Sequence, residues 1–325
     1  MNLKNRAARL ALGLVVFAVA SACSAQPYPS RSIRVIEPYP PGGVLDSLVR
    51  AVSQRLQDVL GQPFVVDNRP GANGNIGLDN CAKASPDGYT LCMTTNDSIS
   101  INPFLYSKLP FDAARDLVPV APLSWANGIF VTHPSIPASN LRELLALGKQ
   151  KPGEITWGTW GNGSTSHLYL AWMNSETGAQ ITHVPYKGSA PLLQAMLAGE
   201  VSAGFLASGI LMPHLKAGKL KPLAVMGAKR LDSLPNVPTL PENGVDFYIR
   251  TWFGTFAPSG TPAPIVERLN AHIGQVISDG SFQEKFLAPA GFEPAIMSTA
   301  QFAAYLKGDR ENGAKLVRAA NVKLD

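Results

Sequence analysis

Residues 35–46, VIEPYPPGGVLD, combine the end of a strand, a glycine turn and the start of a helix. The β-branched run 33–36 stops at prolines, two glycines follow, and a helical pattern begins at Val44. The first amides of a helix have no partner inside it and sit at the positive end of its dipole. The turn therefore predicts a site for a small carboxylate or phosphate, although Pro-Pro-Gly-Gly is also an ordinary turn.

Strands and helices alternate along the rest of the chain. We expect strands at 33–36, 64–66, 89–94, 128–131, 155–158, 181–184, 201–206, 220–226 and 250–257. We expect helices at 45–60, 75–84, 140–150, 164–176, 190–198, 211–217, 264–278, 281–288 and 300–319. This order predicts an α/β fold with largely parallel sheets. A second glycine turn at 161–164 falls in a separate block, so two facing lobes would bring both helix starts onto one ligand.

The first 25 residues have the pattern of a secretory signal peptide. Lys4, Arg6 and Arg9 precede an apolar run at 10–20 that is too short to span a membrane. Small residues follow, and we expect cleavage near Ala25 and export to the periplasm. Cys23 leaves a lipoprotein as the alternative.

The charge balance argues against a nucleic-acid partner. The whole chain has 28 basic and 23 acidic residues, a formal charge of +5. The first 25 residues hold three basic residues and no acidic one, so the rest has 25 against 23, or +2. No basic stripe with interleaved aromatic residues occurs, and the composition is that of a packed globular protein.

Two cysteines remain after the signal peptide, Cys81 and Cys92, on either side of a turn. A disulfide is the default for such a pair in an oxidising compartment. We expect no metal site, because the cysteines have no histidine or second pair at ligand spacing and the histidines are scattered. We also expect no cofactor, since the G-x-G-x-x-G spacing is absent.

Six blocks of sequence occur in order along the mature chain. They are YPSRSIRVIEPYPPGG at 28–43, VVDNRPGANGNIG at 65–77, PDGYTL at 86–91, HVPYKG at 183–188, LKAGKLKPLAV at 215–225 and WFGTFAPSGTPAPIVERLN at 252–270. In these blocks the chain resembles the periplasmic solute-binding proteins of tripartite tricarboxylate transporters, the Bug-type receptors.

The resemblance implies a two-lobed, class II Venus-flytrap fold with a ligand cleft between the lobes. Lobe one would comprise 26–126 plus 251–325 and lobe two 127–250, with hinges near Trp125 and Trp252. It also implies a monomeric receptor without catalytic residues, which captures a small organic carboxylate and delivers it to a membrane permease.

The resemblance also implies ligand-binding residues, at the positions of this chain that match the family motifs. In the first loop, amides of Gly42, Gly43 and Val44 would hold one carboxylate, and Asp46 would brace the loop. Asn96, after strand 89–94, would add a side-chain contact. The other matching positions are Tyr39 in the first lobe and Asn162, Gly163, Ser164, His167, Tyr186 and Lys187 in the second.

Three positions depart from the family pattern. Trp160 stands where smaller residues are usual, either as an aromatic wall for a flat acid or as a packing residue. Ser202 and Leu206 stand where members often carry Asp. The second of these acids would be a partner for a ligand ammonium or hydroxyl, so its loss at Leu206 puts an amino-acid ligand in doubt.

The segment 164–167 also allows a hypothesis of another class, a secreted hydrolase that uses Ser164 or Ser166 with His167. No G-x-S-x-G elbow is present, and residues this close on one helix do not form a dependable nucleophile–base pair. We therefore expect His167 to be structural. A receptor whose ligand complex feeds a signalling partner instead of transport is a third alternative.

Overall fold

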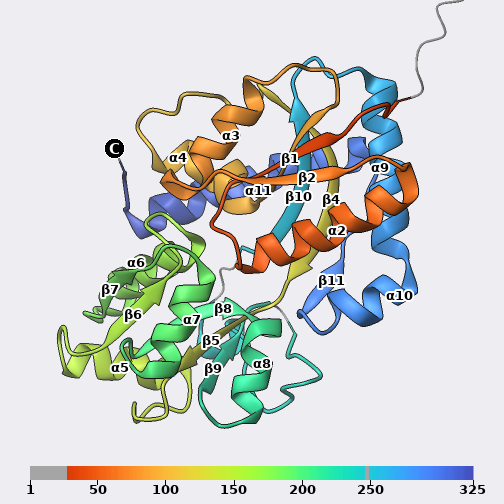
Figure 1. Ribbon diagram of the computed structural model, residues 1–325. Coiled ribbons are helices and arrows are strands. Elements are labelled where there is room, and N and C mark those ends of the chain that lie inside the picture. Colours follow the sequence, from red (N-terminus) through yellow and green to blue (C-terminus); the bar gives the residue numbers. More distant parts are fainter. Residues whose placement is uncertain (1–27, 228, 246–248, 325) are drawn as a thin grey trace, which may run out of the picture.

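Two sheets, each covered by helices, form two lobes in the computed structural model (Figure 1), which describes residues 28–227, 229–245 and 249–324. The expected signal peptide and Cys23 lie outside the described residues. The first-lobe sheet has the order β11 (Phe292–Pro294), β4 (Leu117–Ala126), β10 (Thr251–Pro258), β3 (Thr90–Thr95), β1 (Ile33–Glu37) and β2 (Phe64–Asn68). The second-lobe sheet has the order β7 (Thr182–Pro185), β6 (Thr156–Thr159), β8 (Ala203–Ala207), β5 (Gly128–Thr132) and β9 (Lys221–Val225). The predicted two-lobed α/β architecture is confirmed.

The strand directions are more mixed than the sequence predicts. In the first lobe β1 pairs in parallel with β2 and β3, and in the second β6 pairs in parallel with β7 and β8. β10 and β5, in contrast, are antiparallel to their neighbours in their own sheets. The carboxyl ends of the parallel strands in each lobe are where a ligand site is expected.

The helices follow the predicted pattern closely. The first lobe contains α2 (Val44–Leu60), α3 (Asn75–Ala82), α4 (Asn102–Leu105), α9 (Ala263–Ser278), α10 (Gly280–Phe282) and α11 (Thr299–Ala320). The second contains α5 (Leu141–Gln150), α6 (Thr165–Thr177), α7 (Ser189–Ala198) and α8 (Ser208–Lys216). Among the described helices, none is long and apolar enough to cross a bilayer.

α2 shows how the sequence places the first loop. Leu45, Leu48, Val52 and Leu56 recur at helical spacing and are buried against the sheet. The helix ends at Gly61, which adopts the left-handed conformation with a φ of 70°. The apolar face therefore fixes the helix on the sheet, with its first turn at the carboxyl end of β1.

β4 was not among the predicted strands. Pro119 and Pro122 interrupt its β-branched pattern, and a proline cannot donate to a sheet ladder. The pairing register between β4 and β10 shifts beside both prolines, which is how the sheet accommodates them. The chain then passes into the second lobe through Asn127, between the end of β4 and the start of β5.

The tryptophans expected near the hinges pack inside the first lobe. Trp252 of β10 pairs with Trp125 of β4 across the sheet. The Trp252 side chain is fully buried, and its Nε1 donates to Asp309 Oδ2 at 2.8 Å. Trp125 is half-buried and packs edge-on against Tyr305.

The structure contains Cys81 and Cys92 as free thiols, and their expected disulfide stays a prediction. Both side chains are fully buried, Cys81 on α3 and Cys92 on β3, in a cluster with Ile36 and Leu78. There they act as small apolar side chains. Burial and the neighbouring Cys81 raise the pKa of the Cys92 thiol well above its usual value.

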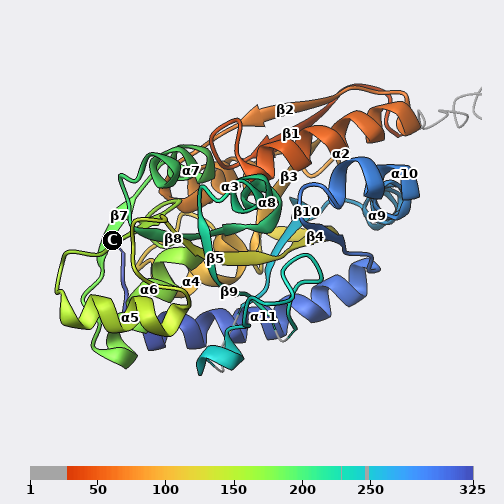
Figure 2. The same cartoon turned by 90° about the horizontal axis from the view of Figure 1, so that it is seen from below.

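α11 joins the lobes on one flank. It packs against the short helical segment 97–101 of the first lobe and against α6 of the second, as Figure 2 shows. An apolar cluster at this junction includes Leu168 of α6 together with Leu316 and Val317 of α11. Gly313 lets α11 approach the segment, since a Cβ there would lie 2.0 Å from the Ser100 carbonyl oxygen.

Gly313→Ala should lower the free energy of unfolding by about 1–3 kcal/mol, because backbone on both sides must move to admit the methyl group. The matched control is Gly274→Ala in α9, where a Cβ would meet nothing within 4 Å. That change should raise stability by about 0.5–1 kcal/mol through helix propensity. Urea denaturation of the mature chain measures both, and equal effects would contradict the close packing at Gly313.

Candidate functional site

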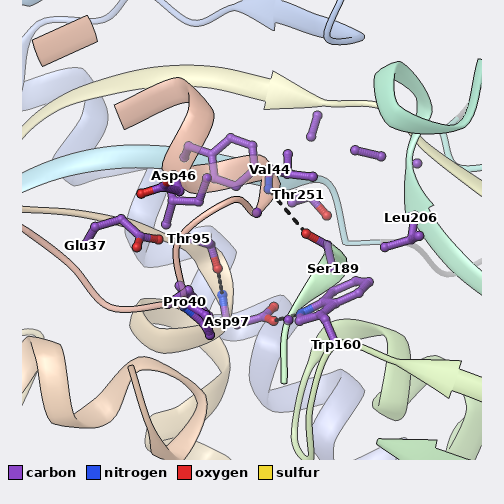
Figure 3. Close-up of a pocket in the computed structure, with 18 of the residues that line it drawn as sticks. Glu37, Pro40, Val44, Asp46, Thr95, Asp97, Trp160, Ser189, Leu206 and Thr251 are labelled. Carbon is purple, nitrogen blue, oxygen red and sulfur yellow. Dashed lines mark hydrogen bonds between the residues drawn. The ribbon is translucent and has the colours of Figure 1, made fainter. Parts of the chain in front are cut away.

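A pocket lies between the two lobes at the carboxyl ends of β1, β3, β6 and β8 (Figure 3). Its volume is about 90 Å³. One buried water needs about 10–15 Å³ on this measure, so the pocket has room for roughly six to nine water-sized groups. It therefore suits a small molecule.

The pocket wall is mostly apolar, and its charged members are all acidic. The apolar part includes Val44, Leu45, Trp160, Phe205, Leu206 and Phe253. The charged residues are Glu37, Asp46 and Asp97, and no Lys or Arg is among the described residues that line the pocket. An anion bound here would depend on neutral hydrogen-bond donors and on the dipole of a helix.

The first loop presents the start of α2 to the pocket. Gly43 precedes the helix and Val44 begins it, and both line the cavity. Asp46 braces the loop from inside the helix, since its Oδ2 accepts from the Gly42 amide at 2.9 Å. Gly42 has a φ of 81°, which favours glycine at this turn.

Asp46 carries a charge that other groups compensate. Burial acts to raise the pKa of its carboxyl, but hydrogen bonds from Arg50, Gly42 and Asn68 outweigh burial and lower it. Arg50 Nε donates to Asp46 Oδ2 at 3.0 Å. The carboxylate is thus ionised and structural.

Asn68 at the end of β2 holds this side of the pocket together. Its Nδ2 donates to Asp46 Oδ1 at 3.0 Å, to the Tyr39 carbonyl oxygen at 3.1 Å and to Glu37 Oε2. One amide group therefore links the ends of β1 and β2 to α2. Glu37 is 0% exposed, and burial raises the pKa of its carboxyl to about 8 although the Asn68 hydrogen bond acts to lower it.

The start of α6, the second predicted anion site, is occupied by a carboxyl group of the protein itself. Asp97 follows β3 in the first lobe and is 2% exposed. Its Oδ2 accepts from the Thr165 amide at 3.3 Å and from Trp160 Nε1 at 3.1 Å, and its Oδ1 accepts from Thr165 Oγ1. Burial raises the pKa of Asp97, against the hydrogen bonds from Thr165 and Trp160.

The second lobe instead meets the first loop through α7. Ser189, the first residue of α7, lines the pocket, and its Oγ accepts from the Val44 amide at 3.2 Å. The serine hydroxyl still has its own proton to donate. Trp160 lines the pocket beside it (Figure 3). Its ring packs against that of Phe205, with centroids 5.7 Å apart.

The structure brings together five of the predicted site residues at the pocket, namely Tyr39, Gly43, Val44, Asp46 and Trp160. Eight others do not line it, namely Gly42, Asn96, Asn162, Gly163, Ser164, His167, Tyr186 and Lys187. The residues of the second loop are displaced from the pocket because Asp97 takes the start of α6. Asn96 is buried beside it, where its Nδ2 donates to Thr165 Oγ1 at 3.3 Å.

The hydroxyl groups of the hydrolase hypothesis have structural roles. Ser164 Oγ donates to the Gly161 carbonyl oxygen at 2.7 Å and caps α6 by accepting from the His167 amide. Ser166 Oγ accepts from Trp157 Nε1 at 3.0 Å. The His167 ring accepts from the Gly163 amide through Nδ1 and stacks on His183 with centroids 3.9 Å apart. Both serines are fully buried, so this geometry does not present a nucleophile to a substrate.

Several pocket residues were missed by sequence reasoning. Glu37 ends β1, Asp97 follows β3, and Ser189 begins α7 after the β7 strand. The sequence could have indicated Glu37 and Asp97, because an acidic residue at the carboxyl end of a buried parallel strand faces the edge of the sheet where ligands bind. Thr251 and Phe253 of β10 gave no such signal, since they enter from an antiparallel strand. Among the described residues, no cluster of three or more His, Cys, Asp or Glu side chains could hold a metal ion.

Asp97→Ala should lower the free energy of unfolding, because the Thr165 amide and Trp160 Nε1 lose their acceptor. A buried donor left unpaired costs about 1–3 kcal/mol. Asp58→Ala is the control, since Asp58 is exposed on α2 and accepts a hydrogen bond from Gln54 at 3.2 Å. Its effect should stay within about 0.5 kcal/mol. Equal losses in urea denaturation would argue against the role of Asp97 between the lobes.

Comparison with known proteins agrees with this geometry. Residues 48–322 match the family described as "Tripartite tricarboxylate transporter family receptor". Protein BugT of Bordetella pertussis is 35% identical over 100% of both chains. The solved structure "R. palustris Rpa4515 with adipate" is 34% identical, with a TM-score of 0.85 over 91% of this chain and 99% of that one. The structure "MatC (Rpa3494) from Rhodopseudomonas palustris with bound malate" is 27% identical, with a TM-score of 0.82 over 89% and 100%. The chain belongs to the family of tripartite tricarboxylate transporter receptors.

Proposed function

We propose that the protein is a periplasmic receptor that binds a small carboxylic acid between its lobes and delivers it to a tripartite tricarboxylate-type permease. The observation that carries this proposal is the start of α2, where Gly43 and Val44 open onto a small pocket that both lobes enclose. Helix starts favour anions. The structures of relatives with adipate and malate support a carboxylate as the anion.

The ligand carboxylate would lie on the first loop and contact neutral donors. The Ser189 hydroxyl, which already bridges to the Val44 amide, can donate its own proton to the ligand. The apolar wall, including Trp160 and Phe253, would cover the carbon skeleton of the acid. Contacts from both lobes would favour the closed arrangement when the ligand is bound.

The remaining parts of the proposal concern the whole receptor. We place lobe one at 26–126 plus 251–325 and lobe two at 127–250, which the membership of the two sheets supports. We propose that the chain is exported, cleaved near Ala25, and acts as a monomer without chemistry of its own. The buried and engaged hydroxyls of Ser164 and Ser166 support the last point.

A thermal-shift screen of the mature chain, refolded to remove bound ligand, tests the proposal with succinate, malate, adipate and benzoate. A ligand at about one hundred times its dissociation constant adds about 2.7 kcal/mol to stability. That raises the melting midpoint by several degrees. A shift with an acid supports the receptor, whereas no shift with any of the four, together with turnover of an ester that His167→Ala abolishes, would favour the hydrolase.

Gly43→Val should abolish binding of the acid that gives the largest shift and leave the fold intact. Gly43 has a φ of −80°, so a side chain is allowed there. Its Cβ would lie 3.4 Å from Ser189 Oγ, and the added methyl groups would fill the approach to the loop amides. Gly280→Val is the control, at an exposed glycine outside the left-handed region with nothing within 4 Å of a Cβ. Calorimetric titration measures affinity, and unchanged affinity in Gly43→Val would refute the site.

A further inference from the structure

The pocket contains a carboxyl group that no cation neutralises. Glu37 is 0% exposed and lines the cavity. Its Oε2 accepts from Asn68 Nδ2, while its Oε1 is buried and has no hydrogen-bond partner among the described residues. Arg50 is bonded to Asp46 and Asn68 instead. A buried polar atom without a partner at a cavity wall indicates a contact that a ligand completes.

An ionised Glu37 would be unfavourable in these surroundings. The group is out of water, and the ionised Asp46 lies on the other side of the shared Asn68 amide. Burying a charge without a counter-ion costs far more than burying a neutral acid. Burial raises the pKa of Glu37 to about 8, and the charge of Asp46 adds to the rise. The side chain is therefore protonated at neutral pH.

A protonated carboxyl has a donor as well as an acceptor. Asn68 donates to Oε2, so the proton belongs on Oε1, which makes no hydrogen bond among the described residues. The Tyr39 amide and the charge of Arg50 act to lower the pKa of this carboxyl, but burial outweighs them. The pocket then offers an O–H group to a bound anion, in a wall where the other charged residues are acidic. A second buried hydroxyl, Thr251 Oγ1, has no hydrogen-bond partner within the described part of the chain; it lines the same pocket and adds a neutral donor.

We propose that Glu37 is a specificity-determining residue that binds as a neutral carboxylic acid and donates a hydrogen bond from Oε1 to a carboxylate of the ligand. The inference rests on the proposed receptor function and deepens it. It explains how a pocket with three acidic residues accepts an anion, since Glu37 contributes a donor in place of a charge. It also makes affinity depend on pH, because an ionised Glu37 repels the same carboxylate.

Three titratable groups around Glu37 keep their charge state between pH 6.5 and 9, namely Asp46, Arg50 and Tyr39. Asp46 of α2 has a lowered pKa and Arg50 a raised one, so both stay charged. Burial raises the pKa of Tyr39 well above its usual value, and it stays neutral. Asp97 faces Tyr39 from the end of β3, and its pKa is also raised by burial. A variant of Glu37 alone separates the contribution of Glu37 from that of Asp97.

The test is calorimetric titration of the mature protein between pH 6.5 and 9 with whichever of succinate, malate, adipate and benzoate binds most tightly. Affinity should be constant up to pH 7 and about tenfold weaker at pH 9, because the protonated fraction falls tenfold for each pH unit above a pKa of about 8. Glu37→Gln keeps a donor that cannot ionise, so it should bind with affinity independent of pH. Glu200→Gln, an exposed change on the second lobe, should keep the wild-type profile.

A wild-type affinity that does not change with pH, or a slope that persists in Glu37→Gln, would overturn the inference and leave the receptor function standing. Loss of binding in a folded Glu37→Gln would also overturn it, since that result requires an ionised Glu37 that accepts from the ligand. No binding of any of the four acids would overturn the proposed function, and the inference with it. If Glu37→Gln does not fold, infrared spectra of the wild type decide, since the band of a buried protonated carboxyl must be present at pH 7 and lost above pH 9.

Discussion

The carboxyl group of Asp97 sets how the two lobes meet. It comes from the end of β3 and accepts from the main chain and hydroxyl of Thr165 and from the indole of Trp160, all in the second lobe. A carboxyl group at a helix start is what the dipole of α6 favours. Because the protein supplies this carboxyl group itself, the start of α6 is closed to a ligand, whereas the starts of α2 and α7 lie at the pocket with Val44 and Ser189. The second lobe also contributes Trp160, which follows β6, and side chains of β8.

This division of roles explains why the pocket needs no cation. The charge of Asp46 is bound to Arg50 and to the Gly42 amide, which fixes the loop that presents Gly43 and Val44. The carboxylate of Asp46 thus fixes the shape of the loop, and the carboxyl group of Asp97 joins the two lobes. Neutral donors and the α2 dipole remain for the ligand, and they lose less on leaving water than a buried lysine or arginine would.

Local patterns predicted the parts of the structure that local chemistry determines. The turn after β1 and the position of Trp160 at the end of β6 were visible as short motifs, and the apolar spacing of α2 fixed its buried face. The residues of the second loop do not line the pocket, because its helix start is filled from a residue 68 positions away in the chain, and their contact with a ligand stays a prediction. The strand β4 was missed because Pro119 and Pro122 break the strand pattern in its sequence. The pairing with β10 shows how both prolines fit, since the register shifts beside each of them.

The contacts that close the pocket differ between its two flanks. On the flank of α6 and α11, the apolar cluster around Leu168 and Leu316 adds to the hydrogen bonds of Asp97, and Leu168, Leu316 and Asp97 are buried. On the flank of α2 and α7, the contact is the hydrogen bond of 3.2 Å from the Val44 amide to Ser189. A single part-buried hydrogen bond contributes about 0.5–1.5 kcal/mol, whereas each buried leucine contributes about 1.5–3 kcal/mol. Separating α2 from α7 therefore costs less free energy than separating α6 from α11. It also uncovers the loop amides on which an anion would lie.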